Sequence, residues 1–160
     1  MNQELKNAIK LRSSGKHDEA LSIIQKLLGK QPSDPLANYH CAWTYDNMGK
    51  EKEAVFHYVS ALENGLSGED RKHTYIGLGS TYRALGEYEK SKKTLKKGLK
   101  EFPDCITLKV FLSMALYNLK DHSQSMKLLL KELLNTTKDK ELLSYRKALE
   151  FYSDKLDQKW

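Results

Sequence analysis

The sequence predicts an all-α fold. Helix-forming residues such as Leu, Lys, Glu and Ala dominate, only three prolines occur, and β-branched residues are sparse, so local preferences favour helix throughout. The same physical roles also recur along the chain at intervals of about 34 residues, which indicates stacked helical units. A length of 160 residues is that of about one domain, so we expect a single domain over residues 1–160.

Four windows carry the repeat. They begin at Gly15, Gly49, Gly86 and Lys120, and their starts are separated by 34, 37 and 34 residues. Three offsets recur: a small residue seven positions before the start, a small residue five positions after it, and a large apolar residue nine positions after it. These positions hold Ala8, Ala42, Gly79 and Ser113, then Ala20, Ala54, Ser91 and Ser125, and then Ile24, Tyr58, Leu95 and Leu129. Each unit is therefore predicted to be two amphipathic helices joined at the glycine, which accepts the positive φ of a helix end.

The expected helix pairs follow the chain in order. They span residues 3–14 with 17–30, 35–48 with 51–64, 69–85 with 88–101, and 105–119 with 122–135, within repeats at 1–34, 35–68, 72–105 and 106–138. Asp34 before Pro35 is a predicted N-cap, as is Asp104, and Ser67 with Asp70 resembles a capping box. The three extra residues between the second and third windows fall in the loop ENGLSGED, where insertions are tolerated.

A ninth helix is expected from about Asp139 to Asp157. It carries Leu142, Leu143, Ala148, Leu149, Tyr152 and Leu156. Because stacked hairpins leave an apolar face open at each end, this helix is predicted to cap the fourth unit. The alternative is that it occupies the binding groove as a self-inhibitor.

The repeat resembles the tetratricopeptide repeat. The stretches CAWTYDNMGKEKEAVFHYVSALENGLSGEDR, GLGSTYRALGEYEKS and KVFLSMALYNL are similar to the short bacterial proteins of tetratricopeptide repeat group 5. The resemblance implies a right-handed superhelix of four hairpins, a bacterial and cytoplasmic protein, and no particular reaction. Lys120 in place of glycine and Glu132 in place of a small residue depart from the pattern and predict an irregular fourth unit.

Repeat proteins of this kind bind peptides on the concave surface that the first helices line. The resemblance implies groove positions, and the candidate partner-binding residues among them are Tyr39, His40, Trp43, Asp46, Asn47, His73, Ile76, Ser80, Arg83, Met114 and Tyr117. Trp43 with Tyr39 forms an aromatic pair typical of binding hot spots; packing between neighbouring helices is the alternative. Asp46 stands between Arg12 and Arg83 in its row, which predicts a charged network, or recognition of a polar ligand group by Arg83.

Gly77, Gly79 and Gly86 lie close together but follow no predicted strand, so they do not indicate a phosphate-binding loop. Gly79 occupies a small crossing position and Gly86 a hairpin bend. Gly77 has no such role, and its missing side chain predicts a pocket beside Ile76 and Ser80.

Several partners and activities are disfavoured. No HExxH, GxSxG or P-loop motif occurs, so we expect neither an enzyme nor a cofactor. His40 and His73 lack a cysteine or carboxylate cluster, and Cys41 and Cys105 lack a CxxC partner, so no metal site is expected. Chaperone-docking tetratricopeptide domains grip a terminal carboxylate with Lys and Asn. The resemblance implies that the corresponding groove positions here hold Leu5, Ile9, His40, His73 and Gly77, so no such clamp is expected.

The formal net charge of +6 permits a nucleic-acid partner. The second helix of the third unit carries six lysines in residues 90–100, but lysine without interleaved aromatics favours a solvated face, so nucleic-acid binding is the minor alternative. No apolar stretch is long enough for a membrane span. Self-association as a homodimer, through the open apolar ends or Trp160, is a further alternative.

Overall fold

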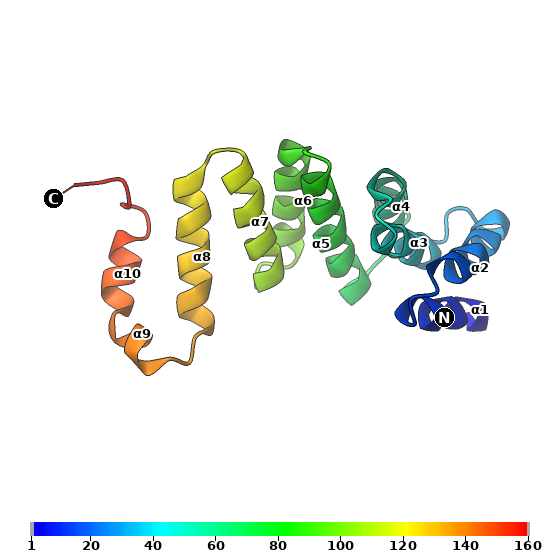
Figure 1. The fold of residues 1–160 in the computed structure, drawn as a ribbon, viewed down its shortest axis with the longest axis horizontal. Coiled ribbons are helices and arrows are strands. Elements are labelled where there is room, and N and C mark those ends of the chain that lie inside the picture. Colours follow the sequence, from blue (N-terminus) through cyan, green and yellow to red (C-terminus); the bar gives the residue numbers. More distant parts are fainter. Residues whose placement is uncertain (1, 160) are drawn as a thin grey trace. The chain divides into compact units, whose positions relative to one another are not determined.

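The structure, a computed structural model, describes residues 2–159, and every regular element in this range is an α-helix (Figure 1). The helices are α1 (Gln3–Ser13), α2 (His17–Lys30), α3 (Pro35–Asn47), α4 (Glu51–Glu63), α5 (Gly68–Ala84), α6 (Tyr88–Glu101), α7 (Ile106–Asn118), α8 (His122–Thr136), α9 (Lys140–Ser144) and α10 (Arg146–Tyr152). The all-α prediction is confirmed. Both ends of each of the first eight helices lie within one residue of the expected position.

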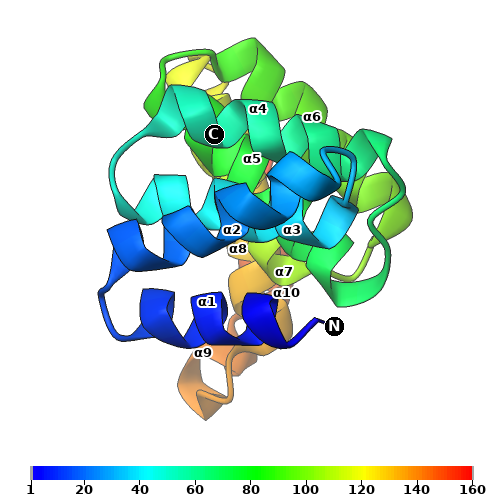
Figure 2. The ribbon, with the colours of Figure 1, turned by 90° about the vertical axis from the view of Figure 1, so that its right-hand side faces the viewer.

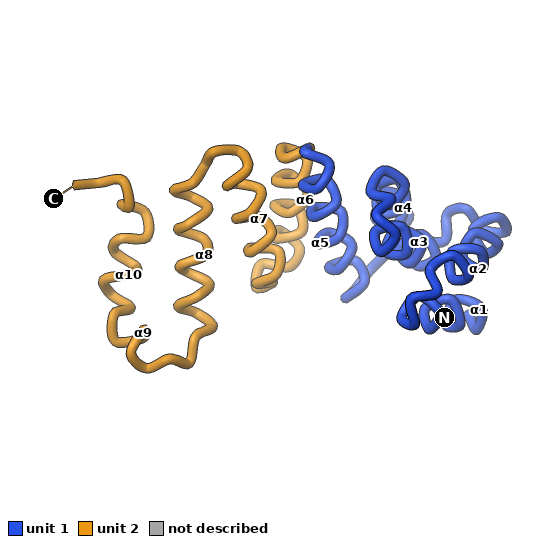
Figure 3. The backbone as a smooth tube through the Cα atoms, in the orientation of Figure 1, with its two compact units in different colours: residues 1–86 blue, residues 87–160 orange. Residues whose placement is uncertain are grey.

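The chain divides into two compact units, residues 1–86 and residues 87–160 (Figure 3). In the first unit α1 packs on α2 and α3 on α4, while α2 also contacts α3 and α4 contacts α5. Figure 2 looks onto α1 and α2, the first hairpin of this unit. In the second unit α7 packs on both α6 and α8, and α10 packs on α8.

Small residues at the helix crossings are buried, as the repeat predicts. Ala8 and Ala20 have no exposed surface and belong to one apolar cluster of the first unit, while Ala42 and Ala54 are equally buried in a second cluster. A methyl group at these positions lets the axes of two helices approach closely, and a larger side chain would force them apart. The repeat spacing thus places the core at the crossings.

Three of the four hairpin bends use glycine in the left-handed region, with φ of +78° at Gly15, +67° at Gly49 and +77° at Gly86. At the fourth bend Lys120 adopts the same conformation, with φ of +66°. The backbone therefore keeps the bend where the sequence departs from glycine, although a side chain costs about 1 kcal/mol in this region.

Of the predicted caps, one is formed. The Asp34 side chain accepts a hydrogen bond from the Ala37 amide at 2.9 Å, at the N-terminus of α3. The prediction for Asp104 is wrong, because α7 begins one residue later and Cys105 occupies the N-cap. Ser67 is the N-cap of α5 but makes no capping bond with its side chain, so the predicted box is also wrong.

The C-terminal segment forms two short helices, not the single helix expected over 139–157. The Tyr145 amide donates to the carbonyl of Leu142, three residues back, and this tight turn separates α9 from α10. Helix α10 contacts α8, where Arg146 donates to the Leu134 carbonyl. No residue within either short helix is buried, so α10 packs only loosely on α8.

Candidate functional site

One of the predicted groove residues of the first unit is an exposed tryptophan in the C-terminal half of α3. Trp43 is 40% exposed, although its neighbours Tyr39 and His40 are only 2% and 6% exposed. The guanidinium of Arg12, from α1, lies over the Trp43 ring with 3.8 Å between Cζ and the ring centroid. The Tyr39 ring packs against Trp43 with 5.8 Å between centroids. The indole is therefore held by its neighbours while part of it faces solvent.

Arg12 and His40 form a hydrogen bond within the cluster of Arg12, Tyr39, His40 and Trp43. Arg12 Nη1 lies 3.1 Å from His40 Nδ1, and because a guanidinium nitrogen can only donate, Nδ1 accepts and the ring proton is on Nε2. Burial, together with the charge of Arg12, lowers the pKa of His40 to about 4, so the imidazole is neutral at pH 7. Burial likewise raises the pKa of Tyr39 to about 12.

Two of the predicted groove residues are thus buried supports in this structure. Tyr39 and His40 present almost no surface to a ligand, and both contact the Trp43 ring. The packing alternative stated for the aromatic pair therefore describes Tyr39, while Trp43 keeps accessible surface.

The carboxylate of Asp46 takes part in a second cluster, which the sequence did not predict. Tyr58 Oη, from α4, donates to Asp46 Oδ2 at 2.7 Å. Thr81 Oγ1, from α5, lies 3.0 and 3.1 Å from the two Asp46 oxygens and 2.8 Å from the carbonyl of Gly77. Burial raises the pKa of Asp46, and the two hydroxyls oppose that rise. The Arg12 guanidinium contacts His40 and Trp43 instead of Asp46. The predicted charged network is therefore wrong for Arg12.

The predicted pocket at Gly77 is filled by a side chain. A Cβ atom built at this glycine would lie 2.6 Å from both Cζ and Oη of Tyr58. The missing side chain makes room for a phenol and not for a ligand, so the pocket prediction is wrong. The signal was present in the sequence, because Tyr58 stands where the other units have Ile24, Leu95 and Leu129 and needs more space than they do.

The remaining predicted residues lie on the first helices as their spacing requires. In the first unit Asn47 and His73 are exposed, and Ile76, Ser80 and Arg83 are half-buried on α5. In the second unit Met114 and Tyr117 on α7 are 37% and 61% exposed. The Tyr117 ring meets the His122 ring edge-on, with 4.7 Å between centroids. Their joint role as a binding groove remains a prediction.

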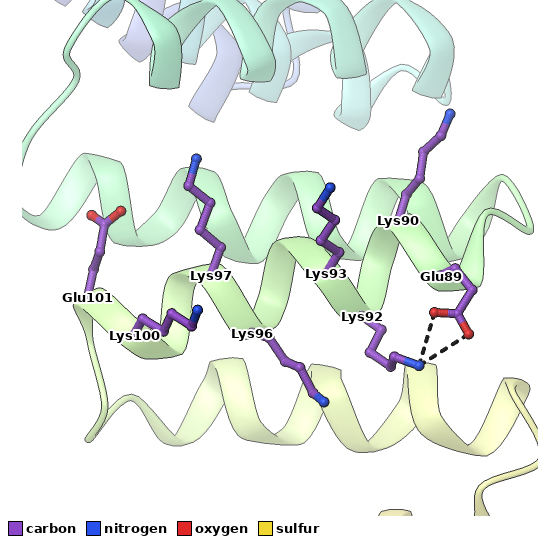
Figure 4. Close-up of a pocket in the computed structure, with 8 residues that line it drawn as sticks. All are labelled: Glu89, Lys90, Lys92, Lys93, Lys96, Lys97, Lys100 and Glu101. Carbon is purple, nitrogen blue, oxygen red and sulfur yellow. Dashed lines mark hydrogen bonds and ion pairs between the residues drawn. The ribbon is translucent and has the colours of Figure 1, made fainter.

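The lysine-rich helix α6 is a solvated cationic surface. Figure 4 shows Lys92 and Lys96 on one side of α6 and Lys90, Lys93 and Lys97 on the other. Glu89 forms an ion pair with Lys92 at 3.0 Å. Surface pairs of this kind contribute little to stability, and with six lysines against two glutamates α6 keeps a net positive charge.

The described residues, 2–159, contain no cluster of three or more histidine, cysteine or carboxylate side chains that could hold a metal ion. Over the same residues, none of the helices combines the length and apolar character needed to cross a membrane. Trp160, which was expected to support self-association, lies outside the described residues. Exposed apolar side chains on α8 and α10, such as Leu133 and Phe151, leave self-association as a prediction.

Comparison with known proteins places these helices in a known architecture. The model of tetratricopeptide repeat group 5, described as "Tetratrico peptide repeat", matches residues 35–156. Among solved structures, MamA from Desulfovibrio magneticus RS-1 is similar with a TM-score of 0.75 and 14% identity, over 96% of this chain and 90% of that one. YrrB, whose structure is titled a TPR protein with an unusual peptide-binding site, gives a TM-score of 0.67 and 16% identity, over 97% and 86%. At these identities the likeness shows the fold alone.

One curated relative is an enzyme. The chain is 29% identical over 142 residues to aspartyl/asparaginyl beta-hydroxylase of Mus musculus, and the match covers 84% of this chain but 19% of that protein. The chain therefore spans about a fifth of that enzyme.

Proposed function

This chain belongs to the tetratricopeptide repeat family, and from that membership we propose that it is a non-catalytic protein-interaction module. Its partner is a peptide or protein segment that lies against the first helices of the repeats. A bacterial, cytoplasmic setting is part of the proposal and rests on the resemblance to the group 5 proteins. The observation that supports the proposal is that the Trp43 ring is partly exposed and is at the same time held by contacts with neighbouring side chains.

Trp43 has the properties of a binding anchor. It is large and amphipathic, and 40% of its surface is exposed. The Arg12 guanidinium stacks on its ring, and Arg12 itself is held by the buried His40. Because these contacts already restrict the ring, a partner that covers it loses less side-chain entropy on binding. Tryptophans of this kind are enriched among the residues that dominate interface energies.

The same surface offers no assembled catalytic chemistry. His40 is neutral and its Nδ1 accepts from Arg12, while the Asp46 oxygens accept from two hydroxyls. Both of these titratable side chains, His40 and Asp46, thus form hydrogen bonds with other side chains of the same unit. This arrangement supports an interaction surface over an enzyme.

The proposal is tested by capture of partners from the native cell, read by quantitative mass spectrometry. Trp43→Ala should remove the specific partners, while its far-UV circular dichroism stays that of the wild type. Phe56→Ala is the matched control, since Phe56 is also an exposed aromatic of the first unit, 68% exposed on α4. Loss of the same partners from both variants, or from neither, would contradict the assignment of Trp43 as the anchor.

A further inference from the structure

The second unit contains a cleft between α6, α7 and α8 that the predicted groove residues do not line. Its volume is about 360 Å³. Leucines form an apolar part of the lining: Leu112 and Leu116 of α7 are 6% and 8% exposed, and Leu128 of α8 is half-buried. A cleft of this size accepts one or two large apolar side chains of a partner.

Three lysines also line the cleft. Lys96 comes from α6, and Lys127 and Lys131 come from α8, four residues apart on one face. Like charges at this spacing repel each other, and an anion between them would relieve that repulsion. Asp121 is the one acidic group of the lining, and its Oδ1 already accepts from the Gln124 amide as the N-cap of α8. The lining is therefore cationic around an apolar centre.

The charge of the chain is concentrated in the unit that contains this cleft. Residues 87–160 contain 16 basic and 11 acidic side chains, whereas residues 1–86 contain 11 and 10, so the second unit accounts for +5 of the formal +6. Helix α6 alone carries six lysines against two glutamates. Such a field favours an acidic partner and speeds its association.

The chain's own C-terminal segment supplies a carboxylate to one lysine of this lining. Asp154, just after α10, forms an ion pair with Lys127 at 3.1 Å. Phe151 and Tyr152, which precede Asp154 by three and two residues, are 48% and 46% exposed. A carboxylate that follows two large aromatic side chains in the sequence thus already pairs with one of the three lysines. Lys96 and Lys131 are exposed.

We propose that this cleft is a second docking site, for an acidic amphipathic peptide segment of a partner protein. An apolar side chain of the segment contacts Leu112, Leu116 and Leu128, and its carboxylates pair with Lys96 and Lys131. A nucleic acid fits less well, because none of the lining residues is an aromatic on which a base could stack. The cleft belongs to the second unit and Trp43 to the first, and this proposal does not depend on the function proposed for the surface around Trp43.

The test uses the full chain and a fluorescein-labelled ten-residue peptide with a central Leu-Phe pair flanked on both sides by aspartates and glutamates. Binding is measured by fluorescence anisotropy at low and at physiological salt. The double variant Lys96→Glu with Lys131→Glu should weaken binding at least tenfold. The control is Lys93→Glu with Lys97→Glu, which changes the net charge equally but on α6 residues outside the cleft, and it should stay within about threefold of the wild type.

Two further binding measurements test the apolar contact and the position of the site. Replacing Leu-Phe by Ser-Ser in the peptide should weaken binding at least fivefold, and Phe56→Ala, at an exposed aromatic of the first unit, should leave binding unchanged. Equal weakening by the two double variants, or indifference to the Ser-Ser replacement, overturns the proposal in favour of a diffuse electrostatic surface. Tighter binding of a single-stranded oligonucleotide of the same charge, lost in the Lys96 and Lys131 variant, also overturns it.

Discussion

A methyl group added at Gly77 is expected to destabilise the first unit, although alanine is the better helix former. The new Cβ would lie 2.6 Å from both Cζ and Oη of Tyr58, and atoms do not approach that closely. Tyr58 is 3% exposed, so its ring is enclosed by neighbouring atoms and moves only if they move too. Either the ring or helix α5 must shift.

The magnitude follows from three contributions. Overpacking a well-filled core costs about 1–3 kcal/mol. A shifted Tyr58 also loses its 2.7 Å hydrogen bond to Asp46, and a bond to a charged group contributes about 1.5–3 kcal/mol. Replacing glycine in a helix offsets about 1 kcal/mol. Gly77→Ala should therefore lower the free energy of unfolding by about 1.5–5 kcal/mol.

Urea unfolding followed by circular dichroism at 222 nm measures this loss, and two comparisons isolate its cause. Gly29→Ala on α2 is the matched control, because a Cβ at Gly29 meets nothing within 4 Å, and it should be neutral or stabilise by up to about 1 kcal/mol. In a Tyr58→Leu background, which lacks the clashing atoms, Gly77→Ala should cost nothing further. An equal loss in the wild-type and Tyr58→Leu backgrounds would refute the reasoning.

Three other perturbations test the remaining packing arguments. His40, whose pKa falls to about 4 on folding, binds protons more readily in the unfolded chain; stability should therefore fall by about 2 kcal/mol as the pH drops from 7 to 5, and His40→Gln should flatten that profile in urea titrations. Lys109 pairs at 3.0 Å with the buried carboxylate of Glu132; Lys109→Met should cost about 3 kcal/mol, and adding Glu132→Ala should recover most of it, as thermal melts of the single and double variants would show. Lys120→Gly should stabilise by about 1 kcal/mol by relieving the positive φ, and a lower Tm for this variant would contradict the strain argument.

The boundaries of the eight repeat helices could be predicted from the sequence, because they depend on local features. A glycine or its substitute ends each first helix, and small residues recur at the crossings whatever surrounds them. Lys120 illustrates the limit of the local argument: the bend persists there because the flanking helices pack against each other and impose the positive φ on a lysine. The irregular C-terminal segment was predicted least well, since its two short helices bury no residue and little packing defines their ends.

The candidate site depended more on tertiary structure. The sequence alone determined that Trp43 lies on a first helix and that Tyr39 and His40 lie near it, because these relations follow from helical spacing. It did not determine that Arg12 would stack on Trp43 instead of pairing with Asp46, or that Tyr58 would fill the space left by Gly77. Those contacts join residues from different helices, and their geometry is set by helix packing, where differences of an ångström decide between a hydrogen bond, a ring contact and an empty pocket.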